Sequence, residues 1–287
     1  MRPKSVRLAQ PASSVTVGAW FDPRRGKRRD DALTALTERG VVLLGETHDE
    51  AEHHRWQLHT IAALFGLRPD MVLGFEMLPR RVQSVLERWS KGELSENDFL
   101  NQLDWPQIWG IDANLYLPMF HFARMHRLPM LALNVDRETN RRVAKEGFSL
   151  PSSERENVGD PAPASSFYRE RLFQWFSQHP GAENAGVDSA RFERFVRGQL
   201  FWDRAMAEAI ANAWRRNGPL IVGVMGSGHI EYGDGVPHQL AALGVDDVGT
   251  ALPWQANTAC PAHDPPIADM LFGVAALQVA DDHEAAR

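Results

Sequence analysis

Four short runs of aliphatic residues constrain the fold of this chain more than any other feature of its sequence. They cover residues 41–44, 71–75, 130–133 and 220–224. None of them alternates apolar with polar residues, so each predicted strand has both faces buried, as in a parallel sheet covered by helices. The runs therefore predict an α/β fold whose central, mainly parallel sheet is flanked by helices.

Amphipathic helical patterns separate the first three runs. After the first run, Leu58, Ile61 and Phe65 recur at helical spacing. Asp49 is placed to cap this helix and Gly66 to end it. Strands and helices that alternate in this way imply right-handed crossovers and parallel strands.

Two further helical stretches, both rich in tryptophan, interrupt this alternation. They cover about 88–117 and 151–217, and the second opens with a Ser/Pro/Ala-rich linker. We expect these insertions to form a helical lobe over the carboxyl ends of the strands. The chain then reads as a single α/β domain over 16–280, between a flexible N-terminus (1–15) and a flexible tail (281–287).

Each predicted strand runs directly into polar residues at its carboxyl end. The first strand is followed by Glu46 and His48, the second by Glu76, the third by Asn134 and the fourth by His229. In open α/β sheets, ligands bind in the crevice outside these strand ends. The residues therefore predict a binding or catalytic cleft. The structural alternatives are that Glu46 caps helix amides and that Glu76 is a buried acid satisfied by backbone amides.

The composition narrows the classes of function. The net charge of −6 argues against a general nucleic-acid-binding protein, which carries a basic excess. The single cysteine, Cys260, leaves no internal disulfide. The longest apolar run, residues 270–277, is far shorter than the ~20 residues of a membrane span. With no signal peptide or lipid-accepting cysteine near the start, we expect a cytoplasmic protein, or a periplasmic or membrane-associated one if an export signal has been removed.

The residues at the strand ends favour a hydrolase when they are considered on their own. Glu46, His48 and His229 offer oxygen and imidazole ligands for a divalent metal ion, which would lower the pKa of bound water. Glu76 would then serve as the general base. In an alternative without metal, a histidine oriented by Glu46 activates water directly. Substrates of an esterase or a protease are both compatible with this hypothesis.

Five segments in order along the chain also resemble a known family. They are VVLLGETHDEAEHH (41–54), GFEMLPRRVQ (74–83), LALNVDRETNRRVAKEG (131–147), GQLFWDRAMA (198–207) and GVMGSGHIEYGDGVPHQL (223–240). Together they are similar to the ChaN-like haem-binding uptake proteins, which are grouped with the Tiki, TraB and erythromycin-esterase-like proteins. The resemblance covers roughly residues 17–245. It implies an α/β fold with a helical lobe and a pocket that contains Glu46, His48, Glu76 and His229.

The resemblance further implies haem as the cofactor and a role in haem or iron uptake or handling. In the haem-binding members a tyrosine ligates the iron, a histidine lies nearby, and haems stack between two subunits. On this chain Tyr232 is the corresponding candidate ligand, with His229 as its partner or as a second ligand, and a homodimer is expected. Tyr232 could equally be a packed turn residue. Gln199 and Asp203 match the family's Gln/Asp helix. Four residues are candidates for the apolar wall of a haem site, with plain core packing as the alternative: Trp105, Trp109, Met119 and Phe122. On family grounds we favour haem over the hydrolase.

Overall fold

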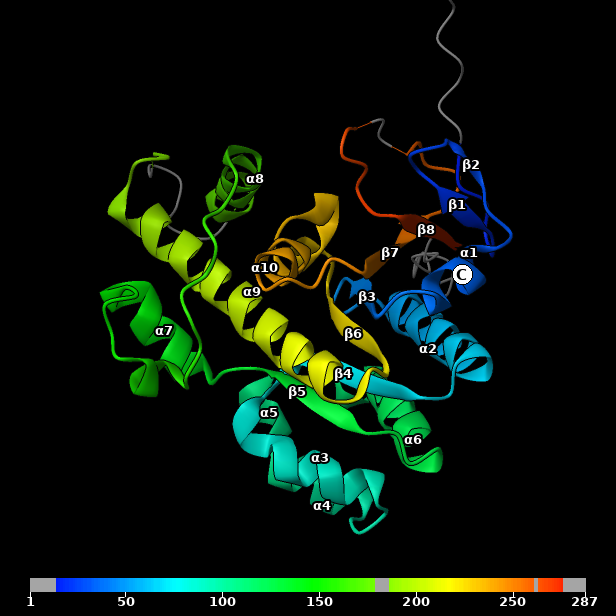
Figure 1. Cartoon of the computed structure of the whole chain (residues 1–287), viewed down its shortest axis with the longest axis horizontal. Coiled ribbons are helices and arrows are strands. Elements are labelled where there is room, and N and C mark those ends of the chain that lie inside the picture. Colours follow the sequence, from blue (N-terminus) through cyan, green and yellow to red (C-terminus); the bar gives the residue numbers. More distant parts are fainter. Residues whose placement is uncertain (1–13, 179–185, 261–262, 276–287) are drawn as a thin grey trace, which may run out of the picture.

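The computed structural model of the protein describes residues 14–178, 186–260 and 263–275. Within them, eight strands form one sheet in the order β2-β1-β8-β7-β3-β6-β4-β5 (Figure 1). The strands are β1 (Trp20–Asp22), β2 (Lys27–Arg28), β3 (Val41–Glu46), β4 (Met71–Pro79), β5 (Met130–Asn134), β6 (Leu220–Gly226), β7 (Val248–Gln255) and β8 (Met270–Val274).

The parallel part of the sheet confirms the predicted fold class. β3, β4, β5 and β6 correspond to the four aliphatic runs, and they pair in parallel with one another. β7 and β8 continue the parallel pairing on the other side of β3. β1 and β2 close that edge in antiparallel fashion.

Helices connect these strands and cover both faces of the sheet. They are α1 (Ala32–Thr37), α2 (Ala51–Leu67), α3 (Gln83–Ser90), α4 (Glu96–Leu103), α5 (Trp105–Ile108), α6 (Leu117–Met125), α7 (Arg137–Glu146), α8 (Ser166–Ser177), α9 (Ala190–Asn217) and α10 (Val236–Ala242). Short 3₁₀ turns stand at η1 (Arg80–Val82), η2 (Ala113–Leu115), η3 (Ser152–Arg155), η4 (Ser227–His229) and η5 (Glu231–Gly233).

The burial of β3 explains why its sequence does not alternate. Val42 and Leu44 pack into the apolar core formed with α1 to α6. Val41 and Leu43 pack into a second core, formed with α9 and α10 on the opposite face. Because both faces of the strand are covered, every position favours an aliphatic side chain.

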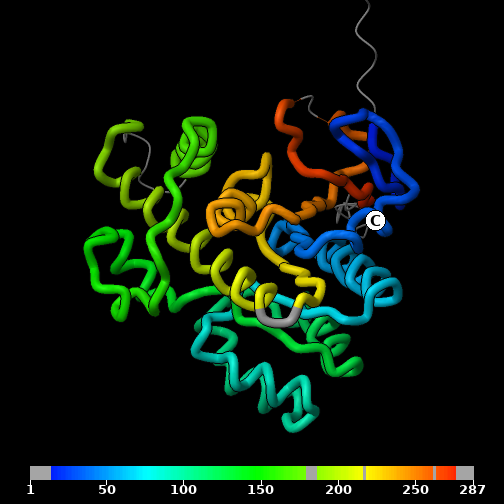
Figure 2. The backbone as a smooth tube through the Cα atoms, viewed as in Figure 1, coloured from blue at the N-terminus to red at the C-terminus, as the bar shows by residue number. Residues whose placement is uncertain are grey.

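A helical lobe extends past the carboxyl ends of β4 and β5. It consists of α7, α8 and the N-terminal part of α9, drawn in green to yellow-green in Figure 2. Two small apolar clusters hold it together. One joins α8 to the start of α9 through Leu172 and Val196, and the other joins α7 to the middle of α9 through Val143 and Phe201. A helical layer over the strand ends is thereby confirmed, with α8 and the start of α9 from the expected insertion 151–217. α7 was not part of that expectation, and α4 and α5, from the other expected insertion (88–117), pack in the core that contains α1 to α6.

Several local details differ from the sequence-based expectations. α2 begins at Ala51 with Glu50 at its N-cap and no side-chain cap, so the expected cap by Asp49 is wrong. The helix ends at Leu67, just after the expected stop at Gly66. The predicted flexible tail (281–287) lies outside the described residues. So does most of the predicted flexible N-terminus, although Val15 of that segment is described and is fully buried.

No helix among the described residues is both long and apolar enough to cross a membrane.

Candidate functional site

A cleft of about 780 Å³ opens at the carboxyl ends of the central strands, between α5, α7 and α9. Its polar lining includes side chains from four strand ends, namely His48, Glu76, Asn134 and His229. Trp109 and Trp202 contribute aromatic surface, Gln199 adds an amide, and Arg81 and Arg137 add positive charge. The cleft thus has the position and the mixed lining that are usual for a small-molecule site.

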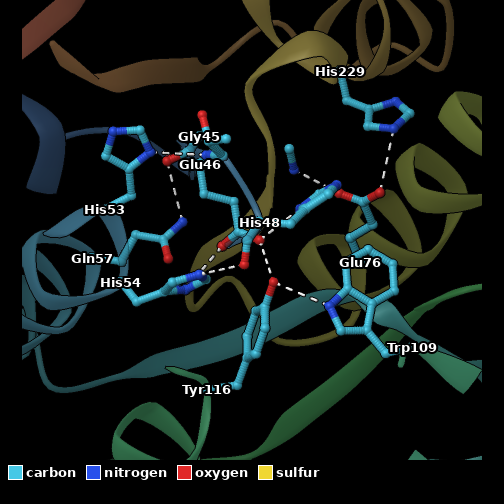
Figure 3. A network of polar contacts seen from close by, with 12 residues as sticks. Gly45, Glu46, His48, His53, His54, Gln57, Glu76, Trp109, Tyr116 and His229 are labelled. Atoms are coloured by element: carbon cyan, nitrogen blue, oxygen red, sulfur yellow. Dashed lines mark hydrogen bonds and ion pairs between the residues drawn. The ribbon is translucent and has the colours of Figure 1, made fainter. Parts of the chain in front are cut away.

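Glu46, at the end of β3, organises the first of two polar networks (Figure 3). Its side chain is fully buried, and its Oε1 lies 2.9 Å from His48 Nδ1. The hydroxyl of Tyr116 donates to the same oxygen at 2.6 Å, and Trp109 Nε1 donates to Tyr116 at 3.2 Å. On the other side, His54 Nδ1 lies 3.4 Å from Glu46 Oε2, without the geometry of a hydrogen bond.

The turn that carries His48 is held by side chains of α2. Gln57 Nε2 donates to the carbonyls of Leu44 and Gly45, each at 3.2 Å. The N–H of Thr47 donates to His53 Nδ1 at 2.9 Å, and His54 Nε2 lies 3.0 Å from the carbonyl of His48. Glu46 is therefore not a helix cap. It is the buried centre of a network that orients an imidazole at the cleft.

Glu76 and His229 belong to the second network. Glu76 Oε2 accepts the N–H of Gly226 at 2.6 Å, and its Oε1 lies 3.3 Å from His229 Nε2. His229 Nδ1 lies 2.6 Å from Asp203 Oδ1 on α9, and Tyr168 of α8 donates to Asp203 Oδ2 at 2.8 Å. Both nitrogens of His229 thus face carboxylates.

The charges of these groups reinforce one another. Burial would raise the pKa of Glu76, but the charge and hydrogen bond of His229 and the charge of His48 lower it to about 2. Burial would lower the pKa of His229, but the charges of Glu76 and Asp203 raise it well above its usual value. His48 behaves similarly: burial opposes protonation, yet the hydrogen bond to Glu46 and the charge of Glu76 raise its pKa. At neutral pH the network therefore holds Glu76 as a carboxylate and His229 as a cation.

Gly226 allows the two networks to meet. A Cβ added at this position would lie 2.9 Å from His48 Cε1 and 3.6 Å from Glu76 Oε2. Any side chain here would displace the imidazole, because real Cβ atoms do not approach so closely. The absence of a side chain at the end of β6 thus brings His48 next to Glu76.

Tyr232, the predicted haem ligand, does not line this cleft. It borders a separate cavity of about 240 Å³ near Pro237 and Pro265. Its ring packs against Phe167, at a centroid distance of 5.2 Å, and lies 4.6 Å below the guanidinium of Arg171. Burial raises the pKa of its phenol, as does the charge of Glu231, while Arg171 opposes this. Tyr232 as an iron ligand stays a prediction.

Other predicted features are only partly brought together. Of the four residues expected to form an apolar wall, Trp109 lines the cleft, while Trp105 and Met119 are buried in the core and Phe122 lines a different cavity. The proposed metal ligands separate into two networks, because Glu46 contacts His48 whereas His229 contacts Glu76 and Asp203. Across the described residues, no group of three or more His, Cys, Asp or Glu side chains is arranged to hold a metal ion.

Fold and cleft together define an α/β protein with paired carboxylates and imidazoles at its strand ends. The family model described as "Haem-binding uptake, Tiki superfamily, ChaN" matches residues 32–240. This match covers most of the chain, so the protein belongs to that family, as the resemblance predicted.

Solved structures agree with this fold. The structure titled "Cofacial heme binding to ChaN of Campylobacter jejuni" is similar with a TM-score of 0.70 and 19% sequence identity, over 88% of this chain and 95% of that chain. A mutant of the erythromycin esterase EreC in its open conformation is similar with a TM-score of 0.50 and 14% identity, over 82% of this chain and 76% of that chain. A search of curated proteins gave no match.

The sequence did not reveal some residues of the site. Tyr116 and Tyr168 are both buried and hydrogen-bonded to site carboxylates. Burial raises the pKa of both phenols, as does the adjacent carboxylate. Because Tyr116 and Tyr168 are two of only three tyrosines in the chain, their scarcity was the available signal.

Proposed function

We propose that this protein binds haem in the cleft at the carboxyl ends of its strands and takes part in haem or iron uptake or handling. The cleft itself supports the proposal, because the chain belongs to a haem-binding family and the cleft is lined by two indoles, of Trp109 and Trp202, and by the imidazole of His48. Its volume of about 780 Å³ lies within the usual range for sites of cofactors and small molecules.

The residues present fit a haem in three respects. Trp109 and Trp202 offer flat apolar surface to the porphyrin. His48 is 36% exposed at its side chain and borders the cleft, so its imidazole is available to a ligand bound there. Arg137 at the rim offers a cation to the carboxylates of the cofactor. When bound, haem supplies an iron centre whose behaviour depends on its axial ligand and surroundings.

A haemin titration followed by absorbance tests this proposal. We expect saturable binding with a shifted Soret band. Trp202→Ala should weaken binding about tenfold, because it removes one aromatic wall. Trp214→Ala, on the same helix but outside the cleft lining, serves as the matched control and should bind as the wild type does. Binding that does not saturate, or that Trp202→Ala leaves unchanged, would contradict a haem site in this cleft.

The expected homodimer can be tested in the same preparation. In this proposal two haem-loaded chains face each other, so haemin should increase the mass measured by light scattering. A monomeric mass with and without haemin would remove the dimer and leave the binding proposal intact.

A hydrolase is the second candidate, and the contact between Glu46 and His48 favours it. A buried carboxylate that orients an imidazole is the arrangement by which proteins hold a general base. His48 Nε2 would take a proton from water while the water oxygen attacks the carbonyl carbon of an ester. The proton would then pass to the leaving alcohol. In this scheme water is the nucleophile, because among the described residues no serine or cysteine borders the cleft and no hydrogen bond joins His48 to Thr139, a threonine that does.

The metal-dependent form of the hydrolase gains no support from the arrangement of the described side chains. Metal analysis of protein purified without chelator tests it directly, and a stoichiometric divalent ion would revive it. For the metal-free form, hydrolysis of p-nitrophenyl esters by the wild type should disappear in His48→Ala. If the wild type hydrolyses no faster than His48→Ala, the enzyme hypothesis fails.

A further inference from the structure

We infer that His48, through Nε2, is the residue of the cleft that ligates the haem iron, and that Glu46 is the positioning residue that orients it. This inference rests on the proposed haem site. It assigns the ligand to a different residue from Tyr232, the candidate implied by the family resemblance.

The orientation of the His48 imidazole supports its assignment as the ligand. Its Nδ1 lies 2.9 Å from the fully buried Glu46 Oε1, so in the neutral imidazole Nδ1 carries the proton and Nε2 keeps the lone pair that a metal ion would take. A histidine ligand of a metal usually donates its other N–H to a carboxylate or a carbonyl in this way. No hydrogen bond to His48 Nε2 is found among the described residues, although the ring borders the cleft and is 36% exposed.

Neighbouring residues fix this orientation of His48 from several sides. Tyr116 donates to the carboxylate of Glu46 at 2.6 Å, and His54 Nε2 lies 3.0 Å from the backbone carbonyl of His48 itself. Trp109 packs its ring at 77° to the ring of His48, with the centroids 4.8 Å apart. Because the orienting carboxylate and the neighbouring indole are both held, the imidazole is preorganised to present one nitrogen to a ligand.

The other imidazole and phenol groups of the site, and the carboxylate of Glu76, are engaged elsewhere. Both nitrogens of His229 face carboxylates, at 2.6 Å and 3.3 Å, and would have to give up one of them to bind iron. Glu76 accepts the N–H of Gly226 and contacts His229. Tyr116 and Tyr168 donate to buried carboxylates. Tyr232 borders a different cavity.

Chemical rescue by free imidazole is the most direct test of His48 as the ligand. His48→Gly removes the imidazole and leaves space that free imidazole can fill. We expect the wild type to bind haemin with the spectrum of an imidazole-ligated ferric haem. His48→Gly should lose this spectrum and bind more than about a hundredfold more weakly. Free imidazole should restore both spectrum and affinity. His48→Gln, examined by circular dichroism and haemin titration, is a second variant should the glycine variant fail to fold, and it should lose the spectrum as well.

The role of Glu46 is tested by the midpoint reduction potential of the bound haem, which a purely structural role would leave unchanged. Glu46→Gln keeps the shape of the side chain but weakens the donation from Nδ1, so the imidazole becomes a poorer donor to ferric iron. We expect a higher midpoint reduction potential and about 10- to 100-fold weaker haemin binding. His59→Ala, an exposed histidine of α2, is the matched control and should leave spectrum, potential and affinity unchanged.

The outcomes separate this inference from the proposed function. If the wild type binds no haemin, the proposed function fails and the ligand assignment fails with it. If the wild type binds but His48→Gly and His48→Gln keep its spectrum, the assignment to His48 is overturned while haem binding stands. If Tyr232→Phe then loses the spectrum, the ligand is Tyr232. The assignment is also overturned if His48→Gly loses the spectrum and imidazole does not restore it, while His48→Gln keeps the spectrum.

Discussion

His229 Nδ1 and Asp203 Oδ1 lie 2.6 Å apart, in a contact that joins the turn after β6 to the middle of α9. The side chain of Asp203 is fully buried, and that of His229 is 12% exposed. A raised pKa of His229 makes this a contact between opposite charges at neutral pH. The contact therefore ties the helical lobe to the sheet at the edge of the cleft.

Asp203→Asn tests how much this contact stabilises the fold. The substitution leaves a buried cationic ring with one of its two carboxylates missing, and we expect a loss of about 3–5 kcal/mol in the free energy of unfolding. Urea denaturation measures it. Asp30→Asn is the control, since Asp30 and its partner Arg28 are 80% and 71% exposed at their side chains, and its loss should stay below about 1 kcal/mol. Equal losses in the two variants would contradict a special role for the buried pair.

The free energy of unfolding should depend on pH through the ionisation of the Glu76 carboxyl. Its pKa is about 2 in the folded protein, against an ordinary pKa of 4.5 for a glutamate carboxyl. A depressed pKa contributes stability that is fully present above the unfolded value and is lost as pH falls through the folded value. The difference corresponds to about 3 kcal/mol. The stability gap between wild type and Glu76→Gln should therefore be large near pH 5.5 and should shrink between pH 4.5 and 2.

His229 sets the alkaline limit of the pH range in which these charges stabilise the fold. Its raised pKa contributes stability that is present below its unfolded value and is lost as pH rises through the folded value. Urea midpoints measured from pH 2 to 9 for the wild type and Glu76→Gln check both directions. A gap that stays constant below pH 4.5 would show that Glu76 is not ionised in the folded protein at low pH.

Gly226→Ala should damage the site more than the fold. The new Cβ would fall 2.9 Å from His48 Cε1, and the imidazole is the part that can move away. We expect haemin affinity to fall about tenfold or more, with a loss of stability near the 1–3 kcal/mol of an overpacked core. Gly66→Ala is the control, because a Cβ there meets nothing within 4 Å and replaces glycine within α2. It should raise stability by about 0.5–1 kcal/mol and leave haemin binding unchanged.

The central sheet and part of the site could be predicted from the sequence, for one physical reason. Strands buried on both faces leave unbroken aliphatic runs, and the chain turns polar where each strand meets the cleft, which located Glu46, His48, Glu76 and His229. β7 was missed because Pro253 and the polar ends of GTALPWQ hide its apolar centre. Tyr116 could not be placed, because it reaches Glu46 from 70 residues away along the chain and nothing local shows which way the turn before α6 faces.

Arg137 should recognise the carboxylates of the cofactor rather than its ring. Its Nη2 donates to the carbonyl of Trp109 at 3.4 Å, which places the guanidinium at the rim of the cleft, and no ion pair of this residue is found among the described residues. An exposed cation of this kind contributes at most about 1 kcal/mol, so Arg137→Gln should weaken haemin binding about two- to fivefold, and less at high salt. The dimethyl ester of haemin, whose carboxylates are blocked, should bind the wild type and Arg137→Gln equally. Arg141→Gln, on the same helix and paired with Glu138, is the matched control and should bind both ligands as the wild type does. An equal loss for haemin and its ester in Arg137→Gln would mean that Arg137 supports the cleft by packing on Trp109 and not by its charge.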